Sequence, residues 1–152
     1  MKVRLRKIYY GDVEMLFNWR NHPAIRQNSF DTSKLSMAGH KEWFVNVLNN
    51  DDIITYILEI GEIPVGVIRF DVEGQILAKI NYFIDPSQQG KGYGSKILAL
   101  GVKRVFKENS ALKKVYGLVL KDNLASIKIF KKLSFDKVWE NTSELKFEKS
   151  IE

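Results

Sequence analysis

The sequence contains no cysteine, only two histidines, three prolines and no long apolar run. The absence of cysteine excludes disulfide bonds, thiolate metal sites and a cysteine nucleophile. With so few histidines we expect no metal ion. The N-terminal stretch MKVRLRKIYY alternates charged and apolar residues, unlike a secretory signal, and no segment reaches the length of a membrane span. These absences predict a cytoplasmic protein with no metal and no membrane partner.

The rest of the composition is typical of one folded domain. Of the 152 residues, 45% are hydrophobic and 28% are charged, and the prolines are scattered rather than gathered into a linker. This length is sufficient for one sizeable core and requires no second domain. We therefore expect a single domain over residues 1–152, present as a monomer or a homodimer.

Positive charge exceeds negative charge, since 24 Lys and Arg stand against 18 Asp and Glu and give a formal net charge of +6. A basic protein favours anionic partners, but the charge alone does not choose among a nucleotide, a nucleic acid and a lipid. No stretch interleaves aromatic and basic residues as nucleic-acid-binding surfaces do, so we expect no nucleic acid. The basic residues are densest in segments 91–107 and 128–132.

The hydrophobic pattern alternates between the period of strands and the period of helices. A first helix follows Gly11 and Asp12 and is broken at Pro23, and Ser36 caps a second helix that ends near residue 49. The expected strands are 3–9, 54–60, 65–72, 76–84, 115–120, 135–140 and 144–149, and the two later helices are 92–108 and 123–133.

The order of these elements predicts a mixed sheet in an α/β protein. Segments 54–60, 65–72 and 76–84 are separated by short turns and should form an antiparallel meander. A strand that is followed by a helix and another strand makes a right-handed crossover, which places its two strands parallel in one sheet. We therefore expect segments 76–84 and 115–120 to be parallel neighbours.

The stretch DPSQQGKGYGSKIL, residues 85–98, places three glycines at alternate positions between an expected strand and an expected helix. Such a turn presents backbone N–H groups and the positive end of the helix dipole to one point, and this arrangement binds anions. The dinucleotide fingerprint fails because Ser95 occupies the place of its third glycine, and the P-loop pattern is absent. A pyrophosphate is the expected guest.

Two motifs resemble the GNAT superfamily of N-acetyltransferases. The first is Q-x-x-G-x-G, at Gln89, Gly92 and Gly94, and the second is the segment NLASIKIFKKLSF, which begins at Asn123. The resemblance implies the GNAT fold: a twisted, mostly antiparallel sheet, flanked by four helices, whose parallel fourth and fifth strands splay around acetyl-CoA. It also implies direct attack of an amine on the thioester, without a metal.

The resemblance implies acetyl-CoA contacts on three elements: the end of the fourth strand, the glycine turn and the last helix. The backbone N–H groups of the fourth strand would also stabilise the tetrahedral oxyanion. The implied cofactor residues are Tyr82, Phe83, Ile84, Gln89, Gly90, Lys91, Gly92, Tyr93, Gly94, Ser95, Asn123, Ser126, Phe130 and Lys132.

The sequence departs from the family at two catalytic positions. Phe130 stands where many members carry a tyrosine acid, and Ala78 stands where some carry a carboxylate. Tyr116, on the fifth strand, is the candidate proton donor, although it is equally compatible with burial in the sheet. His22 precedes Pro23 at a helix end and is a candidate base or a helix cap.

The segments FNWRNHPAIRQNSF and GHKEWF resemble the acceptor region of bacterial nucleotide-amino-sugar acetyltransferases. The polar groups of this region suit a nucleotide diphosphate, and its tryptophans suit either stacking or core packing. The implied acceptor is a small-molecule amine, an amino-sugar nucleotide, and the candidate contacts are Arg20, Asn21, His22, Arg26, His40 and Trp43. Two alternatives remain open: acetylation of a protein or peptide amine, as in ribosomal-protein acetyltransferases, and a non-catalytic acetyl-CoA sensor.

Overall fold

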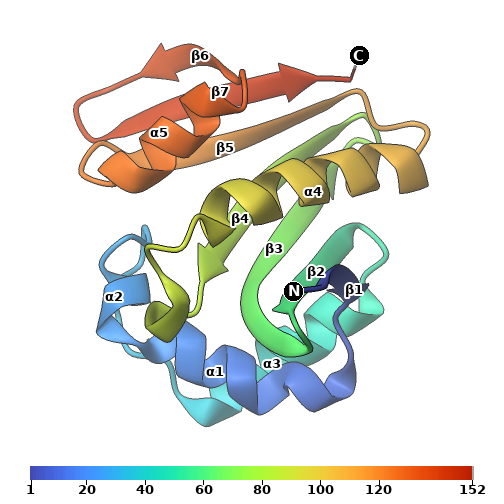
Figure 1. Ribbon diagram of the computed structural model, residues 1–152, viewed down its shortest axis with the longest axis vertical. Coiled ribbons are helices and arrows are strands. Elements are labelled where there is room, and N and C mark those ends of the chain that lie inside the picture. The colour runs from blue at the N-terminus through green and yellow to red at the C-terminus, as the bar shows by residue number, and fades with distance from the viewer. Residues whose placement is uncertain (152) are drawn as a thin grey trace.

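A seven-stranded mixed sheet with the strand order β1-β2-β3-β4-β5-β7-β6 runs through the computed structural model, which describes residues 1–151 (Figure 1). The strands are β1 Val3–Lys7, β2 Ile53–Ile60, β3 Ile63–Glu73, β4 Leu77–Ile84, β5 Lys114–Leu120, β6 Asp136–Glu140 and β7 Glu144–Ser150. The helices are α1 Val13–Asn21, α2 Pro23–Arg26, α3 Met37–Asn49, α4 Tyr93–Glu108 and α5 Leu124–Lys132, with 3-10 turns η1 Tyr10–Asp12 and η2 Pro86–Gln88. The predicted α/β fold is confirmed.

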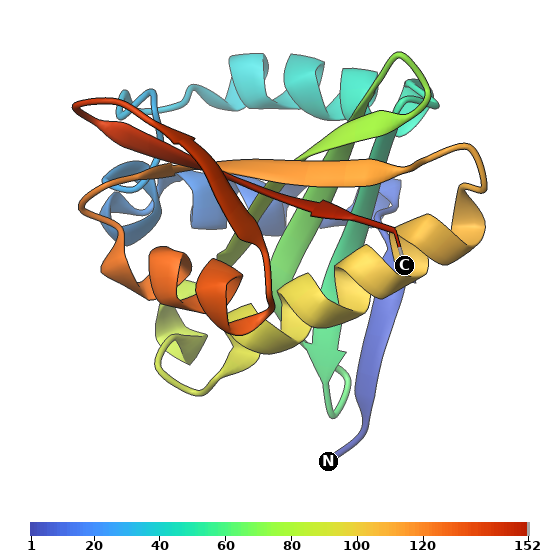
Figure 2. The ribbon, with the colours of Figure 1, turned by 90° about the horizontal axis from the view of Figure 1, so that it is seen from above.

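The two faces of the sheet carry different helices (Figures 1 and 2). Helices α4 and α5 cover one face, where Val105 and Phe130 belong to the larger apolar cluster. Helices α1 and α3 lie on the other face, where Leu16 and Phe44 belong to a smaller cluster. Within residues 1–151, no helix is long and apolar enough to span a membrane.

Tight turns join the three strands of the predicted meander. Gly61 and Glu62 have φ of 57° and 72°, and Gly74 and Gln75 have φ of 59° and 72°. In the two-residue turn between β2 and β3, two successive residues with positive φ match the twist of the flanking strands, whereas the turn between β3 and β4 has three residues, 74–76. As predicted, β2 pairs antiparallel with β3, and β3 pairs antiparallel with the whole length of β4.

The parallel pairing of β4 with β5 is confirmed, but it is short. Only Leu77–Lys79 of β4 are in register with Lys114–Tyr116 of β5, after which β5 continues alongside β7. Residues 80–84 of β4 therefore have no strand partner on their β5 side within the described chain. The two strands diverge, and the gap between them opens toward the glycine turn at the end of β4.

The structure has one helix more than the four expected from the sequence. Pro23 begins the single turn α2 rather than only breaking α1, and His22 caps it by accepting the backbone N–H of Ala24 on Nδ1 at 3.0 Å. Proline is well suited to the first helical position, because its missing N–H has no partner there in any case. A four-residue helix is too short to produce a periodic pattern. The predicted cap at Ser36 is confirmed, since its Oγ accepts the N–H of Gly39.

Candidate functional site

Two cavities meet beside the end of β4. The glycine-loop cavity, of about 660 Å³, is lined by residues of α2, the end of β4, the glycine turn and α5. The arginine cavity, of about 410 Å³, is lined by Arg20, Arg26 and the segment that follows, by β3 and β4, and by β5 and α5. The residues that line both are Ile25, Asn28, Ser29, Tyr82, Phe83, Asn123 and Ser126.

The glycine-loop cavity has the features of an anion site. Gly92 is the N-cap of α4 with φ of 82°, and Gly90 has φ of 80°. A Cβ at either glycine would meet no other atom of the described chain within 4 Å, so both face open space. The first turn of α4 contains no acidic residue, and Lys128 and Lys132 line the cavity from α5. Backbone N–H groups, the helix dipole and two ammonium groups thus favour a phosphate-rich ligand.

Gly94 has a different role in the same turn. A Cβ at Gly94 would lie only 2.8 Å from Cδ1 of Ile129 on α5. The missing side chain therefore leaves room for the Ile129 side chain of α5 against the first turn of α4.

Most of the cofactor residues implied by the resemblance line the glycine-loop cavity, from Tyr82 on β4 to Lys132 on α5. Lys91 and Phe130 do not: the Lys91 ammonium donates to Oε1 of Gln88 at 2.9 Å, and Phe130 lines the arginine cavity. The lining residues that the sequence reasoning missed are Ala24, Ile25, Asn28, Ser29, Gln88, Ala125, Lys128 and Ile129. Of these residues, only Lys128 could have been predicted from the sequence, because it lies one helical turn before Lys132 and therefore on the same face of the helix.

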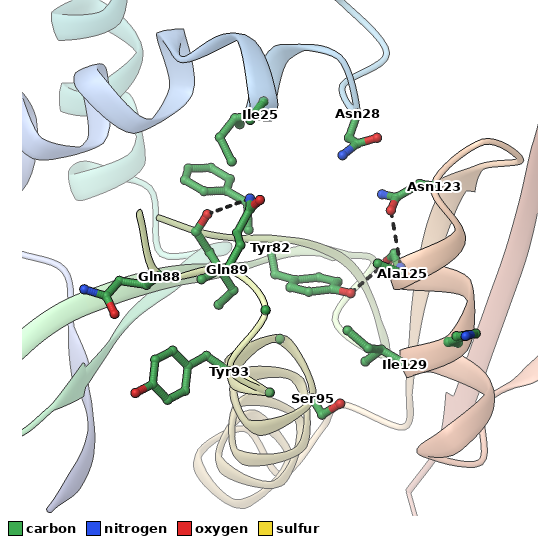
Figure 3. A pocket seen from close by; sticks show the side chains of 18 of the residues that line it. Ile25, Asn28, Tyr82, Gln88, Gln89, Tyr93, Ser95, Asn123, Ala125 and Ile129 are labelled. Carbon is green, nitrogen blue, oxygen red and sulfur yellow. Dashed lines mark hydrogen bonds between the residues drawn. The ribbon is translucent and has the colours of Figure 1, made fainter. Parts of the chain in front are cut away.

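Tyr82 lies where the two cavities join. Its ring extends toward the start of α5, beside Ala125 and Asn123 (Figure 3), and its hydroxyl is 2.7 Å from Oγ of Ser126. Burial raises the pKa of Tyr82 to about 12, so the phenol is protonated at every physiological pH. The backbone N–H of Ser126 is held in turn by Oδ1 of Asn123, which caps α5.

Phe130, at the position of the usual family tyrosine, is fixed by aromatic packing. Its ring stacks on Phe147 with centroids 5.3 Å apart, contacts Phe135 edge-on at 4.9 Å and packs against Tyr82. The tip of the ring lies against β5, because a Cβ at Gly117 would be 2.5 Å from its Cζ. The Phe130 side chain is thus part of the hydrophobic core.

The arginine cavity is strongly cationic. Four of its lining residues are basic and one is acidic: Arg20, Arg26, Arg69, Lys79 and Asp31. Nε of Arg26 is buried without a hydrogen-bond partner in the described chain, whereas Arg69 is paired with Asp71 at 2.9 Å. Burial, together with the positive charge of Arg69, lowers the pKa of Arg20 to about 10. An anion in this cavity would relieve the repulsion between the guanidinium groups of Arg20 and Arg69.

His40 and Trp43 support Arg20 from α3. The guanidinium of Arg20 lies 3.8 Å from the Trp43 ring centroid, and its Nη1 is 2.9 Å from Nδ1 of His40. Nε2 of His40 is 2.7 Å from the carbonyl oxygen of Val13, which can only accept, so Nε2 carries the proton and Nδ1 accepts from Arg20. Burial lowers the pKa of His40, and the charge of Arg20 lowers it further. His40 and Trp43, two of the predicted acceptor residues, line neither cavity and contact Arg20, which lines the arginine cavity.

Three other predicted residues lie outside both linings. Oδ1 of Asn21 accepts the backbone N–H of Leu35, and His22 caps α2, so both organise the chain around the cavity. The hydroxyl of Tyr116 is 2.9 Å from both carboxylate oxygens of Glu73, at the end of the sheet where β4 and β5 are still paired. Within the described chain, only Arg20 and Arg26 of the six predicted acceptor residues reach the arginine cavity.

Comparison with known proteins agrees with this architecture. The family model of the acetyltransferase (GNAT) domain matches residues 2–136. An uncharacterized protein of Methanocaldococcus jannaschii is 27% identical over 143 residues, which are 90% of this chain but only 28% of that protein's length.

Two solved structures have the same fold. The spermidine N-acetyltransferase of Vibrio cholerae, in complex with CoA and spermine, superposes with a TM-score of 0.86 at 17% identity, covering 97% of this chain and 95% of the other. The aminoglycoside acetyltransferase AAC(6′)-Ib, in complex with coenzyme A, gives a TM-score of 0.82 at 20% identity, covering 98% and 95%. From the glycine turn at the opening between β4 and β5 and from the match over residues 2–136, we conclude that the chain belongs to the GNAT acetyltransferase domain family.

Proposed function

We propose that this chain is an acetyl-CoA-dependent N-acetyltransferase that transfers the acetyl group to the amine of a nucleotide-linked amino sugar. The glycine-loop cavity would hold CoA, with its pyrophosphate at the N-terminus of α4 and its pantetheine arm in the opening between β4 and β5. The two fold relatives described above support this, because both were solved with CoA bound.

The positive charge of the arginine cavity is the main reason for proposing an anionic, nucleotide-linked acceptor. Spermine and aminoglycosides, bound or acted on by the two fold relatives, are polycations at neutral pH. In this chain such a molecule would face Arg20, Arg69 and Lys79, and like charges in a partly desolvated cavity repel strongly. A nucleotide diphosphate brings the opposite charge, and guanidinium groups bind phosphate through paired hydrogen bonds.

The shared wall of the two cavities is where the reaction would take place. The acceptor amine, anchored by its anionic part in the arginine cavity, would attack the thioester carbonyl in the glycine-loop cavity. The backbone of residues 80–84, free of strand pairing on the β5 side within the described chain, offers N–H groups to the developing oxyanion. Transfer is direct, and the thiolate of CoA leaves with the electron pair of the C–S bond.

A screen of thiol release from acetyl-CoA tests this proposal. The acceptors are nucleotide-linked amino sugars, the same amino sugars without the nucleotide, polyamines and peptides with a free N-terminus. We expect kcat/KM to be about 10²- to 10⁴-fold higher with the nucleotide than without it, since two hydrogen bonds between charged groups contribute about 1.5 to 3 kcal/mol each. Turnover of polyamines or peptides, with every amino-sugar nucleotide inert, would overturn the acceptor assignment. CoA binding without thiol release for any acceptor would favour the sensor alternative.

A further inference from the structure

The wall between the two cavities contains one titratable side chain. Of the residues in 1–151 that line both cavities, only Tyr82 has an ionisable group, and the others are apolar, amide or serine side chains. Acyl transfer brings together a group from each cavity, so a side chain that donates a hydrogen bond to the leaving sulfur would have to reach this wall.

We propose that the hydroxyl of Tyr82 donates a hydrogen bond to the sulfur of CoA as the C–S bond breaks. This inference rests on the proposed function. It assigns to a residue of β4 the part that the family resemblance gives to a tyrosine on the last helix, where this chain has Phe130. The two rings are in contact, with centroids 6.0 Å apart, so the phenol stays in the same neighbourhood although it comes from another element.

Ser126 controls where the Tyr82 proton points. The two hydroxyl oxygens are 2.7 Å apart, and either can be the donor. When the Ser126 hydroxyl donates to Tyr82, the phenol proton is free to point into the cavity. When Tyr82 donates to Ser126, the phenol proton lies in that hydrogen bond and cannot reach the sulfur. A sulfur that gains negative charge attracts the phenol proton and thus favours the first arrangement. Ser126 is therefore a positioning residue.

Tyr82 acts here as a hydrogen-bond donor and keeps its proton. The pKa of a thiol is about 8.5, well below the raised pKa of this phenol, so complete transfer from Tyr82 to the thiolate is unfavourable. The C–N bond forms, the C–S bond breaks, and the sulfur takes the electron pair. The nitrogen loses one proton to water, and the released thiolate gains one from water, so protons balance without a change in Tyr82.

Phe130 and Tyr116 are less suitable than Tyr82 as hydrogen-bond donors to the sulfur. Phe130 has no hydroxyl group. Tyr116 lines neither cavity, and its hydroxyl is held by the carboxylate of Glu73 on β3. The Tyr116 phenol would have to leave an anionic partner and move away from the paired part of the sheet to reach the sulfur.

Single-turnover thiol release, measured with the acceptor found in the screen, tests the role of Tyr82. We expect Tyr82→Phe to slow this chemical step about 10²-fold, as the loss of one hydrogen-bond donor to a developing negative charge does. The calorimetric Kd of CoA should change less than about threefold, because only the hydroxyl is lost. Tyr10→Phe is the matched control and should leave the rate unchanged, because Tyr10 lines neither cavity and is 80% exposed. Ser126→Ala should slow the step less than Tyr82→Phe does, and Ser126→Thr, which keeps a hydroxyl, should restore part of the loss.

The outcomes separate this inference from the proposed function. A Tyr82→Phe rate equal to that of the unmodified chain would overturn the inference and leave the proposed function intact. A slow Tyr116→Phe with an unaffected Tyr82→Phe would assign the role to Tyr116 instead. A parallel loss of CoA affinity and rate in Tyr82→Phe would reduce Tyr82 to a packing role. Failure of the unmodified chain to release thiol with any acceptor would remove both proposals.

Discussion

The glycine-loop cavity and the arginine cavity are built in different ways. The first depends on backbone: a turn between β4 and α4 whose glycines allow positive φ at Gly90 and Gly92 and leave room for the Ile129 side chain at Gly94. The second depends on basic side chains that come from α1, α2, β3 and β4. A backbone site recognises what all substrates of a family share, whereas a side-chain site can change its charge without changing the fold.

The glycine turn is the place where a single substitution should have the largest effect. Valine at Gly92, where φ is 82°, would force the turn out of shape and displace the N–H groups at the start of α4. We expect the Kd of CoA to rise by at least about 10²-fold, since several hydrogen bonds to charged oxygens are lost together. Isothermal titration calorimetry measures this change.

The matched control is Gly74→Val, in the hairpin between β3 and β4. Gly74 also has positive φ, of 59°, and also faces open space, so the backbone strain is similar while the site is remote. Loss of CoA binding in both variants would mean that strain destabilises the whole domain and that the turn has no special part in binding.

A substitution in the arginine cavity should affect only the acceptor. Arg69→Gln removes one guanidinium and is expected to raise the KM of an anionic acceptor about ten- to hundredfold, the value of one hydrogen bond between charged groups. The Kd of CoA should stay the same, because Arg69 does not line the glycine-loop cavity. Steady-state kinetics with acceptor and calorimetry with CoA distinguish the two effects.

Arg4→Gln is the control for this variant. Like Arg69, Arg4 is paired with a carboxylate, that of Glu59 at 2.8 Å, but it lies on β1 with 59% of its side chain exposed. An equal rise in KM for both variants would show that general surface charge, rather than the arginine cavity, attracts the acceptor.

The difference between the cavities also explains what the sequence could predict. The glycine turn is contiguous, so its glycines and their chemistry were visible in a stretch of 14 letters, residues 85–98. The order of strands and helices was equally accessible, because periodicity is a local property. Among the α-helices of residues 1–151, the single-turn helix α2 was missed, since four residues show no period, and the short 3-10 turns η1 and η2 were missed for the same reason.

The arginine cavity was found only in part because its residues meet through the register of the sheet. Arg69 on β3 is opposite Asn81 on β4, and Asp71 is opposite Lys79. One clue was present: polar residues at alternate positions inside two apolar strands, which place charge on one face of a sheet. The contact between Arg20 and His40, 20 residues apart on two helices, had no comparable clue.

The smallest expected effect concerns pH and again separates the two regions. His40 is buried in its neutral form among Phe17, Trp43 and Phe44, and Arg20 is the charged group that contacts it. Its pKa is lowered on folding, first by burial, so between the lowered value and the ordinary value of about 6.5 the unfolded chain binds more protons than the folded one. Stability therefore rises with pH through this interval and is lost as the pH falls below about 6.5.

His40→Gln, which is neutral at every pH, isolates this contribution. We expect the free energy of unfolding of the unmodified chain to fall relative to that of the variant as the pH is lowered from 7 to 5, by at most about 1.4 kcal/mol per pH unit. Urea titrations at several pH values measure the difference, and the contribution of the carboxylates cancels because both chains share them. Protonation of Nδ1 would also remove the acceptor that holds Arg20, so acid should weaken the arginine cavity through α3. The glycine turn should keep its geometry, because no histidine of the described residues lines the glycine-loop cavity. A constant stability difference between the two chains from pH 7 to 5 would contradict the buried neutral histidine, and with it the support that His40 gives to Arg20.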